Sequence, residues 1–289
     1  MQLQLNWLPD AQHGGFFAAV ANGDYEAVGL DVEILPGGPG TAVLPKLAIG
    51  QCDFAIANAD QVLLARAQEA DVVAVFAAMQ DSPRCIMVHK SAGITDLKGL
   101  SNMTLALGDG KAFAEYLKSR IPLSGVRIVS YSGTIAKFMV DDNFAQQGYV
   151  FSEPIMAEAA GGDPLALMVS ETGFNPYSSV VVTRNALWQK DPELVTKFVQ
   201  ATRAGWEAYL NSPEAANQAI ASHYQDGELD TNILAKSAEA TKVLCKPTSE
   251  VELGTMVLER WETLRSQLIE LKLLPNGSPP AHEAFVTPP

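Results

Sequence analysis

The chain has 289 residues, 47% hydrophobic and 18% charged, a composition that fits a globular protein large enough for two lobes and excludes a disordered one. Its 33 acidic and 20 basic residues give a net charge of −13. Proteins that bind nucleic acids neutralise phosphates with clustered lysine and arginine, so this balance, without a basic stripe, argues against nucleic acid as a partner.

The first part of the chain, residues 1–88, alternates between strand and helix patterns. A helix is expected at Phe16–Asn22, and a second helical segment follows a Gly/Pro turn. The predicted strands are Gln2–Trp7, Gly29–Ile34, Phe54–Ala57, Val72–Ala78 and Cys85–His89. This βαβ alternation is typical of an open parallel sheet, which binds its ligands at the carboxyl ends of its strands.

The same alternation restarts at Lys90. The predicted strands are Met103–Leu107, Val126–Ser130, Gly148–Phe151 and Leu165–Val169. Helices are expected from Gly108 to about Ser119, at Thr134–Val140 and after Ser152.

A further strand, Ser178–Thr183, precedes a helical C-terminal part. Asp191-Pro192 and Ser212-Pro213 each place a capping residue before proline, which indicates two helix starts. An amphipathic helix is predicted at Val251–Leu274, followed by an extended Pro-rich tail.

One α/β architecture accommodates these elements: two lobes, each with a parallel or mixed sheet flanked by helices. Lobe 1 comprises residues 1–88 and 180–289, and lobe 2, residues 89–179, is inserted into it. Two short β crossings, near Cys85–His89 and Ser178–Thr183, join the lobes. Such lobes suit closure around a ligand in a cleft between them.

Candidate ligand-binding residues of lobe 1 follow two predicted strands. Trp7, Asp10 and His13 share the loop after the first strand, where a Trp could stack a flat ring and its polar neighbours could bond the ring's edge. The polar side chains after Phe54–Ala57 could cap the next helix or contact a ligand; they are Asn58, Asp60 and Gln61.

In the second lobe, Asp109 and Glu153 occupy the matching strand-to-helix positions. Glu153 is also favourable there simply as an acid at a helix N-terminus. The aromatic candidates are Phe151 and Tyr177. Four acids (Asp10, Asp60, Asp109 and Glu153) face few cations, with Arg84 nearest, which favours a neutral or cationic ligand with amine donors, such as an aminopyrimidine, over an anion.

Signals for catalysis, metals and membranes are weak. The sequence contains no HExxH, GxSxG, Walker A or GxGxxG motif, and we expect no cofactor and no metal. Cys52, Cys85 and Cys245 lie far apart without zinc spacing and are expected to be buried thiols, although one disulfide remains open. No run of about 18 apolar residues predicts a membrane span.

Several segments together resemble a known family, in order over residues 2–200: Asn6-Trp7, residues 13–19, Gly29-Leu30-Asp31-Val32, Gly50-Gln51-Cys52-Asp53-Phe54, Asp96-Leu97-Lys98-Gly99 and residues 148–154. They are similar to the solute-binding proteins of ABC importers in the thiamine-pyrimidine family, which also contains the fungal thiamine-pyrimidine synthase. The resemblance implies a two-lobed periplasmic-binding fold of type II that delivers a small molecule to a membrane permease and ATPase. Related members bind sulfonates, nitrate or riboflavin.

We therefore expect a monomeric binding protein for a thiamine-precursor pyrimidine or a similar heteroaromatic amine. Trp7 would stack the ring, Glu153, Asp60 and Asn58 would bond its nitrogens, and His13 with Asp10 would hold its other end. One alternative is another ligand, such as an organic sulfonate, nitrate or riboflavin.

A second alternative is a cytoplasmic enzyme that makes or modifies a pyrimidine. The synthase branch of the resembled family uses a lysine for pyridoxal, a histidine and clustered cysteines, and clustered cysteines are missing from this sequence. Met1 precedes the first strand almost directly, so a binding protein would be periplasmic or lipid-anchored only if an export signal has been removed.

Overall fold

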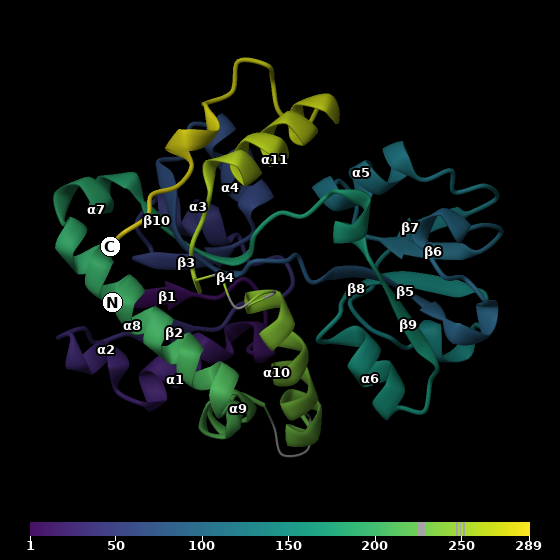
Figure 1. Ribbon diagram of the computed structural model, residues 1–289, viewed down its shortest axis with the longest axis horizontal. Coiled ribbons are helices and arrows are strands. Elements are labelled where there is room, and N and C mark those ends of the chain that lie inside the picture. The colour runs from purple at the N-terminus through teal and green to yellow at the C-terminus, as the bar shows by residue number, and fades with distance from the viewer. Residues whose placement is uncertain (225–228, 247, 249, 251) are drawn as a thin grey trace. The chain divides into compact units, whose positions relative to one another are not determined.

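The computed structural model describes residues 1–224, 229–246, 248, 250 and 252–289. These residues form two compact units (Figure 1). Unit 1 consists of Met1–Asp81, Pro176–Ile269 and Leu274–Pro289, and unit 2 of Ser82–Asn175 and Glu270–Leu273. The chain therefore passes from unit 1 to unit 2 after Asp81 and returns after Asn175, and the short stretch Glu270–Leu273 also groups with unit 2.

Unit 1 is built on a five-stranded sheet with the order β2-β1-β3-β10-β4. Its strands are β1 (Gln2–Gln4), β2 (Glu33–Leu35), β3 (Phe54–Ala57), β4 (Val72–Met79) and β10 (Ser178–Arg184). β1 runs parallel to β2 and β3, whereas β10 runs antiparallel to β3 and β4. Every residue of β4 is buried, because this strand contacts helices as well as β10.

The helices of unit 1 pack around this sheet. They are α1 (Gly14–Ala21), α2 (Asp24–Ala27), α3 (Val43–Ala48), α4 (Ala59–Ala67), α7 (Asn185–Lys190), α8 (Pro192–Asn211), α9 (Glu214–Ala221), α10 (Thr231–Cys245) and α11 (Leu258–Glu270). The longest, α8, begins where the sequence predicts, since the Asp191 carboxylate accepts a hydrogen bond from the Leu194 N–H at 3.0 Å. Its Phe198 ring is fully buried and stacks on Phe54 with 3.7 Å between centroids.

Unit 2 repeats the plan of unit 1 in its own sheet, with the order β7-β6-β8-β5-β9. The strands are β5 (Arg84–His89), β6 (Thr104–Leu107), β7 (Arg127–Ser130), β8 (Phe144–Tyr149) and β9 (Pro164–Met168), and the helices are α5 (Ala112–Arg120) and α6 (Glu153–Ala159). In both sheets the fourth strand is antiparallel to its neighbours: β10 in unit 1 and β5 in unit 2. Each of these two strands begins shortly after the chain has entered the unit.

Several predicted boundaries differ from the structure. The sequence assigns Cys85–His89 to lobe 1 and starts lobe 2 at residue 89, but β5 pairs with β8 and β9 in unit 2. The chain also leaves unit 2 after Asn175 rather than after residue 179. Both passages precede a strand: β5 begins at Arg84 and β10 at Ser178. These two strands therefore belong to the sheets of the units and are not crossings between them.

Two predicted helices are shorter than expected. Residues 134–137 form bends and a turn, so only Phe138–Val140 is helical there, as a single 3₁₀ turn. Phe138 is fully buried against Met87 and Phe144, which anchors this segment by packing. The helix predicted at Val251–Leu274 is observed as α11, Leu258–Glu270; Val251 lies outside the described residues.

A buried imidazole ties β5 to the start of β9. His89 Nδ1 lies 2.6 Å from the Asp163 carboxylate, and Nε2 lies 3.1 Å from the Phe138 carbonyl oxygen. Asp163 also accepts the Ser91 N–H at 3.0 Å. The hydrogen bond from His89, reinforced by that from Ser91, lowers the pKa of Asp163 from 3.8 to about 2.

This lowered pKa predicts acid sensitivity. A carboxylate with a lower pKa in the folded than in the unfolded chain stabilises the fold above pH 3.8, and its contribution disappears as the pH falls towards 2. Urea unfolding should therefore separate wild type from Asp163→Asn at pH 5 and bring them together near pH 2. Asp142→Asn removes the same charge at an exposed site and serves as the control. A separation that does not depend on pH would contradict the assigned role of the carboxylate.

All three cysteines are free and buried. Burial raises the pKa of each thiol, so little reactive thiolate forms near neutral pH. We expect a disulfide reagent such as dithionitrobenzoate to leave the folded protein unlabelled and to titrate three thiols in denaturant. Rapid labelling of the native protein would show that one of these side chains is accessible.

Candidate functional site

The loop after β1 is held together by His13. The imidazole is completely buried, with Nε2 at 2.9 Å from Asn6 Oδ1 and Nδ1 at 3.2 Å from the Asp10 carboxylate. Asp10 caps the short turn Ala11–His13 and accepts the backbone and side-chain N–H groups of Gln12, both at 3.0 Å. Both ring nitrogens of His13 are thus engaged within the loop, and this residue orders it.

Trp7 is exposed in the same loop, with 37% of its surface accessible. Its carbonyl accepts the Gly37 N–H at 3.0 Å. A side chain at position 37 would place its Cβ 2.4 Å from the Leu5 carbonyl oxygen, so only glycine allows this approach. The Gly-rich turn predicted from sequence therefore supports the backbone beneath Trp7.

The polar residues after β3 lie at the same edge of the sheet, because β1 and β3 are adjacent and parallel, with Gln4 opposite Ala55. Asn58 is the N-cap of α4, and its N–H donates to Gln61 Oε1 at 2.9 Å, which makes Gln61 part of a capping box. Asp60 lies in the first turn of α4. The hydroxyl of Ser178, at the start of β10, donates to Asn58 Oδ1 at 2.8 Å.

In unit 2, Glu153 is the centre of the corresponding edge. It opens α6 directly after β8, and its two oxygens accept different donors: the Tyr131 hydroxyl at 2.6 Å and the Tyr149 N–H at 2.7 Å. Together with burial, the neighbouring carboxylate strongly raises the pKa of Tyr131, so its hydroxyl stays protonated and remains a donor. The carboxylate is thus fixed in place by its own unit and is only partly buried.

Arg84, the cation predicted to lie nearest the four acids, pairs with the residue whose N–H holds this carboxylate. As the first residue of β5 it pairs with Tyr149 of β8. Its guanidinium carbon lies 4.1 Å from the centroid of the Tyr149 ring and 4.5 Å from that of Phe113. These cation–π contacts occupy one face of each ring, so those faces are covered by the protein's own side chain.

Asp109 follows β6, and its register places it level with Tyr149, because Ala106 pairs with Gln146. It accepts the Ser130 hydroxyl at 2.7 Å. The preceding Gly108 N–H donates to Gln147 Oε1 at 2.5 Å, which fixes the end of β6 to β8. Asp109 therefore lies at the same edge of the unit 2 sheet as Glu153.

Two predicted aromatic residues are buried within their own units. Phe151 is 1% exposed, and its ring packs on Tyr149 with 5.4 Å between centroids. Tyr177 is 2% exposed; its hydroxyl accepts the Val257 N–H at 3.0 Å, and its ring carries the Arg260 guanidinium at 3.9 Å. Both side chains therefore pack within their own units in this structure.

Several candidate residues and their hydrogen-bond partners lie in two half-sites, one in each unit. The unit 1 half-site comprises Trp7, Asp10, Asn58 and Asp60, and the unit 2 half-site comprises Arg84, Asp109, Tyr131, Tyr149 and Glu153. Sequence reasoning did not assign the roles of Tyr131, Tyr149 and Ser178, because these depend on which strands pair and in which register. Only one sequence feature pointed to a residue of the unit 2 half-site that pairs across strands: Arg84 directly precedes the predicted strand Cys85–His89.

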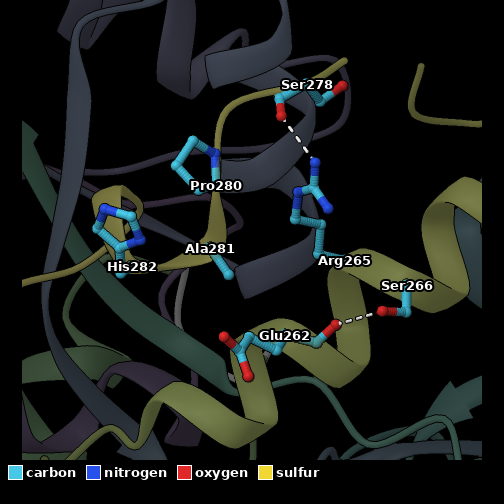
Figure 2. A pocket seen from close by; sticks show the side chains of 7 residues that line it. All are labelled: Glu262, Arg265, Ser266, Ser278, Pro280, Ala281 and His282. Carbon is cyan, nitrogen blue, oxygen red and sulfur yellow. Dashed lines mark hydrogen bonds between the residues drawn. The ribbon is translucent and has the colours of Figure 1, made fainter. Parts of the chain in front are cut away.

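Surface depressions within the units lie elsewhere. One of about 400 Å³ is formed by α11 and the C-terminal tail, where Arg265 points towards Ser278 (Figure 2). Another, of about 370 Å³, lies in unit 2 around Lys98 and Arg120. Neither is lined by a predicted ligand-binding residue. Among the described residues, no group of three or more His, Cys, Asp or Glu side chains could hold a metal ion, and none of the helices could span a membrane.

Comparison with solved structures shows that this is the fold of periplasmic binding proteins. The periplasmic aliphatic sulphonate binding protein SsuA from Escherichia coli aligns with a TM-score of 0.74 and 13% identity over 100% of this chain and 92% of that one. The desulfurization enzyme DSZB shares the fold with a TM-score of 0.63 and 14% identity over 98% and 96%. The predicted fold class, two mixed α/β sheets of this type, is confirmed.

The chain belongs to the NMT1/THI5-like family, whose model matches residues 10–216. It is 26% identical over 226 residues to the riboflavin-binding protein RibY of Chloroflexus aurantiacus, an alignment that covers 74% of this chain and 63% of that protein. It is 22% identical over 279 residues to a formylaminopyrimidine-binding protein of Halalkalibacterium halodurans, covering 93% of this chain and 84% of that protein. The chain therefore spans less than two thirds of the length of the first relative.

Proposed function

We propose that this protein is the solute-binding component of an ABC importer and that it binds a small heteroaromatic molecule with amine donors, such as a thiamine-precursor pyrimidine. The observation that carries the proposal is the Glu153 carboxylate, held at the carboxyl end of β8 by the Tyr131 hydroxyl and the Tyr149 N–H. Carboxylates have about four acceptor positions, so two remain for N–H donors of a ligand, such as the amino group of an aminopyrimidine.

In this proposal the ligand contacts both half-sites. Trp7 stacks on the ring, and Asn58, Asp60 and Asp10 provide acceptors from unit 1, with Asp109 and Glu153 from unit 2. Lobe closure then excludes water from these contacts, which makes each one stronger. The names of the two relatives, a formylaminopyrimidine-binding protein and a riboflavin-binding protein, support a flat nitrogen heterocycle over an anion.

The anionic alternatives, sulfonate and nitrate, have less support from the half-sites. Arg84 is the cation of the unit 2 half-site, and its guanidinium is stacked between Phe113 and Tyr149 beside the Glu153 carboxylate. An anion there would meet Glu153 and Asp109 as well. Because like charges repel strongly at short range in a partly buried site, a neutral or cationic ligand is favoured.

The enzyme alternative has little support from the histidine and the cysteine closest to the half-sites. His13 uses both ring nitrogens within its loop, and the Cys85 thiol is fully buried, with its pKa raised by burial and by Glu153. Fold alone does not separate the two classes, since the desulfurization enzyme DSZB has the same architecture.

As the solute-binding component of an importer, the protein in our proposal is an extracytoplasmic monomer. Its partners are a permease and an ATPase.

Calorimetric titration tests the proposal. The panel contains aminopyrimidine thiamine precursors, formylaminopyrimidine, riboflavin, thiamine, taurine and nitrate, each followed by product analysis. Sub-micromolar binding of a pyrimidine, returned unchanged, is the expected result. Binding of riboflavin alone would keep the class and replace the ligand. Binding of taurine or nitrate alone, or turnover of any compound, would overturn the proposal.

A further inference from the structure

Two of the segments through which the chain passes between the units, after Asp81 and after Asn175, have no regular secondary structure. They are residues 80–83, between β4 and β5, and residues 174–177, before β10; we call them the connecting segments. A change in the arrangement of the two units must include backbone rotations in these residues, because they join the units. How firmly each end of a connecting segment is held therefore decides where the chain can pivot.

The first connecting segment is fixed to the C-terminal part of unit 1. The N–H groups of Gln80 and Asp81 both donate to the Leu244 carbonyl at the end of α10, at 2.8 and 3.0 Å. The Gln80 side chain is 4% exposed, and its Nε2 donates to the carbonyls of Ala77 and Thr255, both at 3.0 Å. A glutamine with this many buried partners is held rigidly.

The second connecting segment is fixed to the same region. The Tyr177 carbonyl accepts the Ala59 N–H at 3.0 Å, and its hydroxyl accepts the Val257 N–H at 3.0 Å, directly before α11. The last residue of the segment is therefore attached both to the unit 1 half-site, through the start of α4, and to the start of α11.

Arg260, in the first turn of α11, touches both connecting segments. Its Nη2 donates to the Gln80 carbonyl at 2.5 Å, and its guanidinium lies over the Tyr177 ring at 3.9 Å. A planar guanidinium can make a directed hydrogen bond and stack on a ring at the same time, which a lysine ammonium does not reproduce. Beyond this contact, the Ser82 N–H donates to Asn175 Oδ1 at 2.7 Å and joins the two segments within unit 2.

We propose that Arg260 is a positioning residue for ligand binding. By joining Gln80 to Tyr177 it confines rotation within the connecting segments to residues 81–83 and 175–176, where Pro83 and Pro176 further restrict the backbone. The closed arrangement is thereby reached by a defined rotation rather than by a broad set of orientations. This inference rests on the proposed function in one respect: the two units close on a ligand.

The test compares two arginines of the same helix. Arg260→Lys keeps the charge and loses the planar contact with both connecting segments. Arg265→Lys is the matched control, because Arg265 also donates to backbone carbonyls, those of Pro279 and Ser278 at 2.9 and 2.8 Å, but in the C-terminal tail (Figure 2). Tyr177→Leu removes the other partner of the stack and provides a second, independent variant.

Distances between the units are measured by energy transfer between dyes on Ile49→Cys and Val140→Cys. These positions are 72% and 78% exposed and lie in different units, whereas the native cysteines are buried. In the ligand-free protein, Arg260→Lys and Tyr177→Leu should each broaden the distance distribution, and the double variant should add little to either. Stopped-flow measurements with the tightest panel compound should show dissociation faster by about 3- to 30-fold for Arg260→Lys.

Wild-type distances and dissociation rate in Arg260→Lys would overturn the inference, as would an equal change in Arg265→Lys, which would show general destabilisation. If no panel compound binds the wild-type protein, the proposed function fails by itself. The ligand-free distance distributions still decide the role of Arg260 in that case.

Discussion

Replacing Glu153 by alanine should weaken ligand binding by about 1–3 kcal/mol, roughly a 5- to 150-fold increase in Kd. The variant removes the acceptor for the amine edge of the proposed ligand. It also leaves the Tyr131 hydroxyl and the Tyr149 N–H without their partner. Titration with the compound that the wild-type protein binds most tightly measures the effect.

Glu158→Ala is the matched control for this prediction. Glu158 lies on the same helix, α6, and is exposed, so its loss changes the net charge equally. Its Kd should stay within about twofold of wild type, as expected for an exposed charge. Wild-type affinity in Glu153→Ala would remove the carboxylate from the proposed site, whatever the ligand proves to be.

Replacing Gly205 by alanine should lower the free energy of unfolding by about 3 kcal/mol, the upper end of the usual cost of overpacking. At this position α8 crosses α1 so closely that a Cβ would lie 2.4 Å from the Gly15 carbonyl oxygen and 2.6 Å from the Ala19 nitrogen. Both atoms belong to the backbone of α1, which cannot rotate away as a side chain could. The two helices would have to separate and open the packing around Trp206.

Gly277→Ala provides the comparison. A Cβ at Gly277 would meet nothing within 4 Å, so this substitution should change stability by less than about 1 kcal/mol. Urea denaturation of both variants measures the difference. Equal stability of Gly205→Ala and wild type would mean that α1 and α8 are farther apart in solution than in this structure.

Local signals in the sequence were sufficient for most individual elements. The start of α8 was predictable because Asp191 and Pro192 act through contacts within one helical turn. The strand at Ser178–Arg184 was predictable because its Val180-Val181-Val182 run is buried from both faces of the sheet. Residues 134–137 were mispredicted as helix, because their anchor is the packing of Phe138 against side chains distant in sequence.

The site was less predictable than the fold, for one physical reason. The sequence locates the ends of the strands, where the polar side chains lie. It does not show which groups form hydrogen bonds with these side chains, because those groups come from other segments of the chain. His13 and Tyr177 have residue types suited to ligand binding, yet both are held by partners that only the folded chain brings near: Asn6 for the imidazole and Arg260 for the ring. Glu153 is the reverse case, since its partners fix it in place without burying it completely.

The antiparallel fourth strands determine the order in which the chain can complete its two sheets during synthesis. All five strands of the unit 2 sheet lie between residues 84 and 168. The unit 1 sheet cannot join β3 to β4 until β10, residues 178–184, has left the ribosome. The inserted unit can therefore complete its sheet first. Until β10 is synthesised, the edges of β3 and β4 that pair with it have no partner, and unpaired strand edges are prone to aggregation.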